Sequence, residues 1–320
     1  MGKEMGTAMK MQKNGTGNTQ LDLLTSINLD DFCKAFGASP HGGTTWLLRR
    51  LLRPAARRFA RQIINFDQEV LEVGLAAASQ QFLETYIQGM QVTGVENLPI
   101  DSPLLVLSNH PGLTDTLALF ASIPRPDLRV VALDRPFLRA MPETNRRLFF
   151  VSDQTDGRIN VIRSVGRHLR AGGAVLTFPA GEIEPDPASM PGSIAGLENW
   201  SRSLAFFVRI SPETRIIPVI VSGVYAPQAL RHPLVNLRRS SKDREILAAN
   251  LQILVKSISV RIWPVNLHVD FGPPILSEDL LKLGDASQIT QAVTNYVQGL
   301  LEVVHPAEAQ HMIDDSQPAR

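Results

Sequence analysis

The chain has 320 residues, of which 44% are hydrophobic and 20% charged, and its formal net charge is +1. A chain of this length and hydrophobic content can bury one large core with appendages, and its near-neutral charge does not indicate a nucleic-acid-binding protein. The single cysteine, Cys33, excludes an intramolecular disulfide framework and a cysteine-based zinc site, and is compatible with a reducing compartment.

Both ends of the chain are poor in large apolar side chains. We therefore expect disordered tails at residues 1–25 and 306–320. The N-terminus lacks the apolar stretch of a secretory signal, and no run of about 18 apolar residues could span a bilayer. The sequence thus predicts a cytoplasmic protein that is soluble or lies peripherally on the inner face of a membrane.

Residues 26–91 are expected to form a helical module. From Thr44 to about Gly89, apolar residues recur at three- and four-residue steps, which is typical of amphipathic helices. Pro54 should begin a new helix or kink the first, and residues 67–88 should form a second helix. The apolar positions of the first helix are Leu48, Leu51, Leu52, Ala55, Phe59 and Ile63.

Six arginines lie between Arg49 and Arg61 in this module. A basic amphipathic helix lies in the plane of a membrane interface, where each arginine near an anionic surface contributes about 1 kcal/mol. The alternative is a helix that packs on the rest of the protein with its arginines in water. The side chains expected to meet the membrane are Trp46, Arg49, Arg50, Arg53, Arg57 and Arg58.

After Gly94 the pattern changes to short β-rich runs separated by helical stretches. Near-continuous apolar strands that alternate with helices are typical of a sheet covered on both faces. The sequence therefore predicts an α/β domain at residues 92–305, built on a mixed, partly parallel sheet covered by helices. The expected strands are residues 104–108, 129–133, 148–152, 174–178, 216–222 and 267–271.

The chemistry is expected where the first of these strands ends and a helix begins at Thr114. His110 is followed five residues later by Asp115, and of the seven histidines only His110 has an aspartate at this spacing. A carboxylate in the first helical turn would fix the tautomer of the imidazole and raise its basicity, which makes a general base for a substrate hydroxyl. On spacing alone, a helix cap formed by Thr114 or Asp115, with His110 as a bystander, is an equal alternative.

Two further segments offer groups for a polar ligand. Arg163 should lie where an extended segment passes into a helix, and there it and free backbone N–H groups would suit a phosphate. The alternative is an ordinary surface arginine. Residues 178–181 (FPAG) form a second strand-to-turn junction, where Gly181 permits close approach to a ligand, although such a turn is most often only a turn.

In combination, these segments resemble the four sequence blocks of the lysophospholipid and glycerol-3-phosphate acyltransferase superfamily, with order and spacing that agree across roughly residues 92–276. The patterns are H-x-x-x-x-D, G-x-x-F-V-x-R, F-P-E-G-T-R and an apolar strand with a proline. The first pattern, here preceded by an asparagine, is matched by Asn109, His110 and Asp115, and the second by Gly157, Val161 and Arg163. The third pattern is matched by Phe178, Pro179 and Gly181, and the fourth by Ile216, Ile217, Pro218 and Val219.

The third block departs from the family pattern. Ala180 replaces its glutamate, Glu182 its threonine, and Ile183 its phosphate-associated arginine. A strongly anionic acceptor such as glycerol 3-phosphate is therefore less expected than a lysolipid with another headgroup. Glu182 either orients the backbone or the acceptor, or is simply solvated. The resemblance implies acceptor- or phosphate-binding roles for Gly157, Arg163, Phe178, Pro179, Gly181 and Glu182.

The resemblance implies an O-acyltransferase that moves a fatty acyl group from acyl-CoA or acyl carrier protein to a hydroxyl of a lysophospholipid or glycerolipid at a membrane surface. His110 would be the general base and Asp115 would orient it. N–H donors near Gly181 or in the turn after His110 are expected to stabilise the oxyanion. No metal, no nucleotide cofactor and no nucleic-acid partner is expected, because the sequence has no P-loop, no G-x-G-x-x-G and no clustered histidines.

Two other functions stay open. One is a hydrolase or transacylase on the same scaffold, which the motifs do not separate from an acyltransferase. The other is a non-catalytic lipid-binding relative, which the altered third block suggests and the retained His110 and Asp115 oppose.

Overall fold

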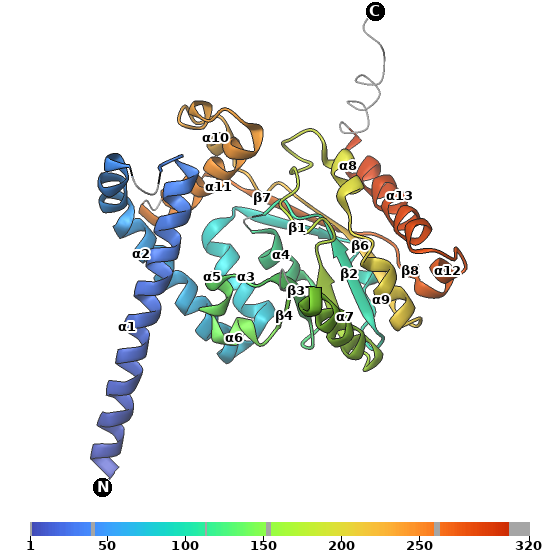
Figure 1. The fold of residues 1–320 in the computed structure, drawn as a ribbon, viewed down its shortest axis with the longest axis horizontal. Coiled ribbons are helices and arrows are strands. Elements are labelled where there is room, and N and C mark those ends of the chain that lie inside the picture. Colours follow the sequence, from blue (N-terminus) through green and yellow to red (C-terminus); the bar gives the residue numbers. More distant parts are fainter. Residues whose placement is uncertain (1, 40–41, 113, 152–154, 259–262, 307–320) are drawn as a thin grey trace, which may run out of the picture. The chain divides into compact units, whose positions relative to one another are not determined.

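The computed structural model describes residues 2–39, 42–112, 114–151, 155–258 and 263–306 (Figure 1). The chain divides into two compact units, each made from three stretches. The first unit comprises Met1–Glu72, Arg135–Asn145 and Ala226–Trp263; the second comprises Val73–Asp134, Arg146–Tyr225 and Pro264–Arg320. This division differs from the contiguous boundaries that the sequence predicts, because two later segments join the N-terminal helices.

The first unit is helical. Helix α1 (Gly2–Ala35), helix α2 (Gly43–Val73) and helix α11 (Ser241–Ile258) meet in a small hydrophobic core. This core consists of Leu29, Phe32, Ala55, Ala56 and Leu254. The shorter elements of the unit are α5 (Pro136–Arg139), α6 (Pro142–Asn145), α10 (Pro227–Leu230) and the 3-10 helix η3 (Val235–Leu237).

The N-terminal helices differ from those that the sequence predicts. Helix α1 begins at Gly2 and continues past residue 25, within the range where a disordered tail is predicted, and its Leu21 and Leu24 side chains are buried. Helix α2 continues through Pro54, which is exposed, so water can satisfy the carbonyl group that the proline leaves without a partner. The break falls instead at Gly74, whose φ of 87° is left-handed, before α3 (Leu75–Tyr86).

The structure bears on two further predictions, the C-terminal tail and the absence of a membrane-spanning segment, only within the residues that it describes. Of the tail predicted at residues 306–320, only Pro306 lies within the described residues. Across the helices that the structure describes, none is long and apolar enough to cross a bilayer.

The second unit is an α/β domain with an eight-stranded sheet in the order β1-β7-β6-β2-β5-β3-β4, with β8 paired to β6. Neighbouring strands are parallel except where β6 pairs with β7 and β8. The strands are β1 (Gly89–Thr93), β2 (Leu104–Ser108), β3 (Arg129–Leu133), β4 (Leu148–Val151), β5 (Ala174–Thr177), β6 (Arg215–Ser222), β7 (Asn266–Phe271) and β8 (Ile275–Leu276). The predicted mixed, partly parallel sheet is confirmed, and all six predicted strands are present. Strands β1 and β8 are additions.

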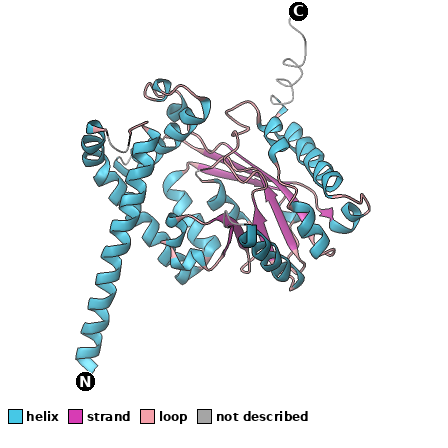
Figure 2. Cartoon of the chain, viewed as in Figure 1, coloured by secondary structure: helices cyan, strands magenta, loops and turns pink. Residues whose placement is uncertain are grey.

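Helices cover both faces of this sheet (Figure 2). On one face, α7 (Thr155–Arg170), α9 (Leu204–Ile210) and α13 (Ala286–Val304) pack on the central strands through one hydrophobic cluster. Helix α4 (Asp115–Ser122) packs on α3 and contacts β7. Strand β2 is buried along its whole length because its side chains serve two covered faces. The remaining elements are η1 (Val95–Asn97), α8 (Ser193–Gly196), η2 (Leu197–Asn199) and α12 (Ser277–Leu281).

The topology brings three strand ends together. Strand β2 lies between β5 and β6 and is parallel to both, so the carboxyl ends of these strands lie at one edge of the sheet. The chain leaves β2 at Asn109, β5 at Phe178 and β6 at Gly223. Ligand sites of open α/β sheets form at such edges.

Candidate active site

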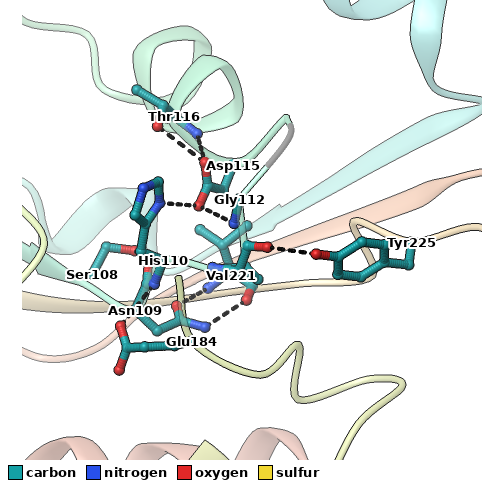
Figure 3. A network of polar contacts seen from close by, with 10 residues as sticks. Ser108, Asn109, His110, Gly112, Asp115, Thr116, Glu184, Val221 and Tyr225 are labelled. Carbon is teal, nitrogen blue, oxygen red and sulfur yellow. Dashed lines mark hydrogen bonds and ion pairs between the residues drawn. The ribbon is translucent and has the colours of Figure 1, made fainter. Parts of the chain in front are cut away.

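His110 and Asp115 lie side by side at this edge (Figure 3). The Nδ1 atom of His110 is 2.7 Å from Oδ2 of Asp115. Because Nδ1–H donates this bond, the other ring nitrogen, Nε2, has the lone pair that can accept a proton. The His110 side chain keeps 27% of its surface exposed and that of Asp115 keeps 1%. A substrate can therefore reach the imidazole but not the carboxylate.

The Asp115 carboxylate is hydrogen-bonded at both oxygens. Its Oδ2 also accepts from the backbone N–H of Gly112 at 2.8 Å, and its Oδ1 accepts from Oγ1 of Thr116 at 3.0 Å and from the Thr116 N–H. Burial raises the pKa of Asp115, but the charge and hydrogen bond of His110 and the bonds from Gly112 and Thr116 outweigh it and hold the pKa below its usual value. Asp115, the first residue of α4, therefore accepts from an N–H group of the first helical turn and also orients His110, whereas the N-cap position is held by Thr114 without a side-chain hydrogen bond.

The pKa of His110 is raised above its usual value. Burial lowers it, but the charge and hydrogen bond of Asp115 and the charge of Glu184 outweigh this effect. A higher pKa makes the neutral imidazole a stronger base. It also means that the ring becomes protonated, and can no longer accept a proton, at a higher pH than a free histidine.

Hydrogen bonds to β6 and to the segment after it hold the loop that carries His110. Asn109 bonds both backbone groups of Val221, since its Nδ2 donates to the carbonyl oxygen at 2.9 Å and its Oδ1 accepts from the N–H at 2.8 Å. The hydroxyl of Tyr225 donates to the carbonyl oxygen of Pro111 at 3.2 Å. The backbone on both sides of His110 is therefore fixed to the neighbouring strand and its extension.

Residues 178–181 contact the pair formed by His110 and Asp115, the dyad, through the aromatic ring of Phe178. The ring of Phe178 stacks on the imidazole of His110, with centroids 4.2 Å apart and planes 26° apart. Pro179 is buried, and its carbonyl oxygen accepts from the N–H of Ser201 at 2.9 Å. Gly181 has a φ of 70°, and nothing lies within 4 Å of the position that a Cβ would take. Phe178 thus belongs to the candidate site, and Gly181 leaves open space beside it in the turn.

Glu184 is the site residue that sequence reasoning missed. Glu182, the predicted carboxylate, is exposed, whereas Glu184 keeps only 5% of its surface exposed. Its Oε2 accepts from the N–H of His110 at 2.9 Å, and its Oε1 accepts from Nε1 of Trp200 at 2.9 Å. Burial raises the pKa of Glu184 to about 7, against the lowering effects of Trp200 and His110. No local pattern marks this residue, because its partner His110 is 74 positions away.

Residues 157–163, the second block of the pattern, lie within helix α7 and not at the strand-to-helix junction that the sequence predicts. Arg163 is exposed in the middle of α7, about two turns from the helix start, and not at a strand-to-helix junction. Strand β4 ends at Val151 and α7 begins at Thr155, so the free N–H groups of the first turn lie well before Arg163. Gly157 lies in that first turn. The predicted pairing of Arg163 with a helix start is therefore wrong.

Several backbone amides near the dyad already have partners. The N–H of His110 donates to Glu184 and that of Gly112 to Asp115. The N–H of Gly181 donates to the carbonyl oxygen of Phe178 at 3.0 Å. In this arrangement these three amides are not free to bind an oxyanion, in contrast to the expectation for Gly181 and the turn after His110.

The predicted membrane-facing residues lie in the first unit, on α2. The exposed side of this helix carries Trp46, Leu47 and Leu51, whose exposed fractions are 67%, 53% and 66%. The opposite side packs through Ala55 and Ala56. The exposed arginines among those predicted are Arg50, Arg53 and Arg58.

Two other predicted arginines bind carboxylates of α1. Arg49 forms an ion pair with Asp30, and Nη1 of Arg57 lies 2.8 Å from Oδ1 of Asp22. Exposed pairs of this kind contribute little to stability, but they reduce the positive charge that the helix offers to a membrane. The exposed side of α2 thus carries apolar side chains and arginines together.

Comparisons with known proteins give one family match and one similar solved structure. Residues 89–222 match the family model described as Acyltransferase, a segment that runs from β1 to the end of β6 and includes His110, Asp115 and Glu184. This segment is therefore similar to the acyltransferase family. Among solved structures, the chain is similar to the 1-acyl-sn-glycerophosphate (LPA) acyltransferase PlsC from Thermotoga maritima, with 15% identity, 85% of each chain covered and a TM-score of 0.41. No curated protein sequence matches the chain.

The pKa of His110 depends on Asp115, and this dependence can be measured. Asp115→Asn removes the charge that raises the pKa, so the pKa of His110 should fall. It can be followed by NMR titration of the ring C–H resonances, with the His110 signal identified by its loss in His110→Ala. Asp101→Asn, which changes an exposed carboxylate in the loop before β2, should leave the pKa unchanged. An unchanged pKa in Asp115→Asn would contradict the assigned interaction.

Proposed function

We propose that the protein is an O-acyltransferase that transfers a fatty acyl group from a thioester of coenzyme A or acyl carrier protein to a hydroxyl of a lysolipid. The observation that carries this proposal is the 2.7 Å contact between His110 and the buried Asp115, within a segment that is similar to the acyltransferase family. The dyad supplies an accessible base and no nucleophile of its own. A substrate hydroxyl is therefore the nucleophile.

The proposed reaction needs one proton carrier. Nε2 of His110 takes the proton of the acceptor hydroxyl as its oxygen attacks the thioester carbonyl carbon. The tetrahedral intermediate then expels the thiolate, which takes the proton from the imidazolium, and an ester and a free thiol are formed. Asp115 keeps the proton on Nδ1 and stabilises the imidazolium, and positioned proton transfer of this kind contributes about 10²–10⁴-fold to the rate.

Ile183 supports an acceptor that is less anionic than glycerol 3-phosphate. It stands where the family pattern has an arginine, and its Cδ1 lies 2.9 Å from the position that a Cβ on Gly112 would take. An apolar side chain thus lies against the turn between His110 and Asp115. A cation at this place would favour a phosphate, whereas isoleucine favours contact with an acyl or neutral part of the acceptor.

A lipid acceptor is met at a membrane, and the exposed side of α2 suits this role. Trp46 carries an amphipathic ring, and the guanidinium of Arg50 lies 5.9 Å from its centroid. Exposed apolar side chains among arginines are typical of helices that lie in an anionic membrane interface. We infer a peripheral attachment through Trp46, Leu47 and Leu51, with Arg50 and Arg53 near lipid headgroups.

The reaction is tested by the release of free thiol from acyl-CoA and from acyl carrier protein, with a panel of lysolipids and glycerol 3-phosphate as acceptors. Wild type should release thiol faster with a lysolipid than with glycerol 3-phosphate. His110→Ala should lower kcat by about 10²–10⁴-fold, because the base is lost. His232→Ala, which removes a partly exposed histidine of the first unit, is the matched control and should keep wild-type activity.

Each outcome of this assay is informative. Retained activity in His110→Ala would contradict the proposed base. Thiol release that needs no acceptor would indicate a hydrolase on the same scaffold. No thiol release with any donor and acceptor would favour a non-catalytic lipid-binding protein.

Membrane attachment is tested by co-sedimentation with vesicles that contain anionic phospholipid. Leu51→Ala should weaken binding by up to about 50-fold, since it removes three carbon groups that contribute about 0.8 kcal/mol each when buried, and about 1.4 kcal/mol is a factor of ten. Leu71→Ala is a matched control, because Leu71 is 65% exposed on the same helix but lies between Glu69 and Glu72. Binding should also weaken as salt is added. Equal losses in both variants would contradict attachment through the start of α2.

A further inference from the structure

Glu184 is a buried carboxylate that the proposed proton transfer does not use. It lies in the loop after β5, between the exposed Glu182 and the buried Asp186. Burying a carboxylate costs folding free energy unless both of its oxygens are hydrogen-bonded or paired with a charge. The contacts of Glu184 therefore indicate its role.

Glu184 holds the backbone of His110 at two atoms. Its Oε2 accepts from the His110 N–H at 2.9 Å, and its own N–H donates to the His110 carbonyl oxygen at 2.8 Å. Asp115 holds the imidazole of the same residue at Nδ1. The main chain and the ring of His110 are thus fixed by two different carboxylates (Figure 3).

The other end of the Glu184 carboxylate is anchored in the hydrophobic core. Its Oε1 accepts from Nε1 of Trp200, which keeps 4% of its surface exposed and belongs to the cluster beneath the sheet. Two residues further on, the Asp186 carboxylate accepts from the N–H groups of Gly223 and Val224 at 2.8 and 2.9 Å. The segment that carries Glu184 is therefore fixed at the end of β6 as well.

From these contacts we propose that Glu184 is a positioning residue for the proposed acyl transfer, and that the catalytic orientation of His110 requires its carboxylate to be ionised. An ionised carboxylate accepts at both oxygens, which matches the two N–H donors of His110 and Trp200. A proton on either oxygen turns an acceptor into a donor and weakens one of the two bonds. The inference rests on the proposed function for its kinetic consequence but not for its geometry.

The protonation of Glu184 falls in the range where the enzyme would work. Its pKa is raised to about 7 by burial, and the charged groups that act on it are His110, which lowers the pKa, and Asp115, which raises it. The Glu184 charge in turn raises the pKa of His110. The acid limb of the activity profile should therefore reflect both the loss of ionised Glu184 and the protonation of His110 as the pH falls.

Two substitutions should move this acid limb in opposite directions. Glu184→Gln removes the charge, so the pKa of His110 falls and the limb moves to lower pH, while kcat falls by up to about 10²-fold because the loop is held less well. Trp200→Phe removes a donor that lowers the pKa of Glu184, so the limb moves to higher pH. Glu198→Gln, an exposed change in η2, should alter neither kcat nor the limb.

The experiment measures kcat and KM for thiol release against pH in wild type and these three variants, with folding checked by circular dichroism. A uniform loss of kcat with an unmoved acid limb in both Glu184→Gln and Trp200→Phe would indicate a structural role only and overturn the proposal. If Glu184→Gln does not fold, the upward shift in Trp200→Phe remains decisive.

A readout that is independent of activity separates this proposal from the proposed function. The pKa of His110, measured by NMR in wild type and Glu184→Gln, should be lower in the variant even if no acceptor is turned over. An unchanged pKa of His110 would overturn the coupling, whereas absent thiol release with a lowered pKa would overturn only the proposed function.

Discussion

The hydrogen bond between His110 and the buried Asp115 is the interaction on which the site depends. A buried carboxylate without partners would cost on the order of several kcal/mol. Here the cost is offset because His110, Gly112 and Thr116 all donate to Asp115. The carboxylate thus closes the turn after β2 and starts α4, so the geometry of the base and the local fold are set by the same group.

The parallel sheet supplies the second constraint. Because β2 lies between β5 and β6 with the same direction, segments far apart in the sequence reach one edge. The segment after β5 brings Phe178 and Glu184, and the end of β6 brings Val221 and its bonds to Asn109. Phe178 therefore contacts the ring of His110, Glu184 binds its backbone, and Val221 binds the preceding residue, Asn109. The sheet brings these three groups together.

Local patterns in the sequence predicted the strands and the dyad. The strands are continuous apolar runs because both faces of the sheet are covered, and His110 and Asp115 meet across a single turn. Contacts between distant segments left no such pattern. Glu184 reaches His110 over 74 positions, and the helices of the first unit are joined by segments from beyond residue 134.

The prediction that Arg163 lies at a helix start was wrong because the sequence does not fix where helix α7 begins. The sequence pattern placed Arg163 near a helix start, but the helix begins at Thr155, and periodicity does not fix a helix start to within two turns. The role of the third block shows the same limit: the pattern drew attention to Glu182, whereas burial and hydrogen bonds distinguish Glu184.

The most direct measurement is a crystal structure of the protein with a lysolipid acceptor and a non-reactive thioether analogue of acyl-CoA. The proposed mechanism predicts the acceptor hydroxyl oxygen within about 2.6–3.2 Å of Nε2 of His110, directed at the carbonyl position of the analogue. A hydroxyl bound away from His110, with both ligands otherwise ordered, would contradict the assignment of His110 as the base.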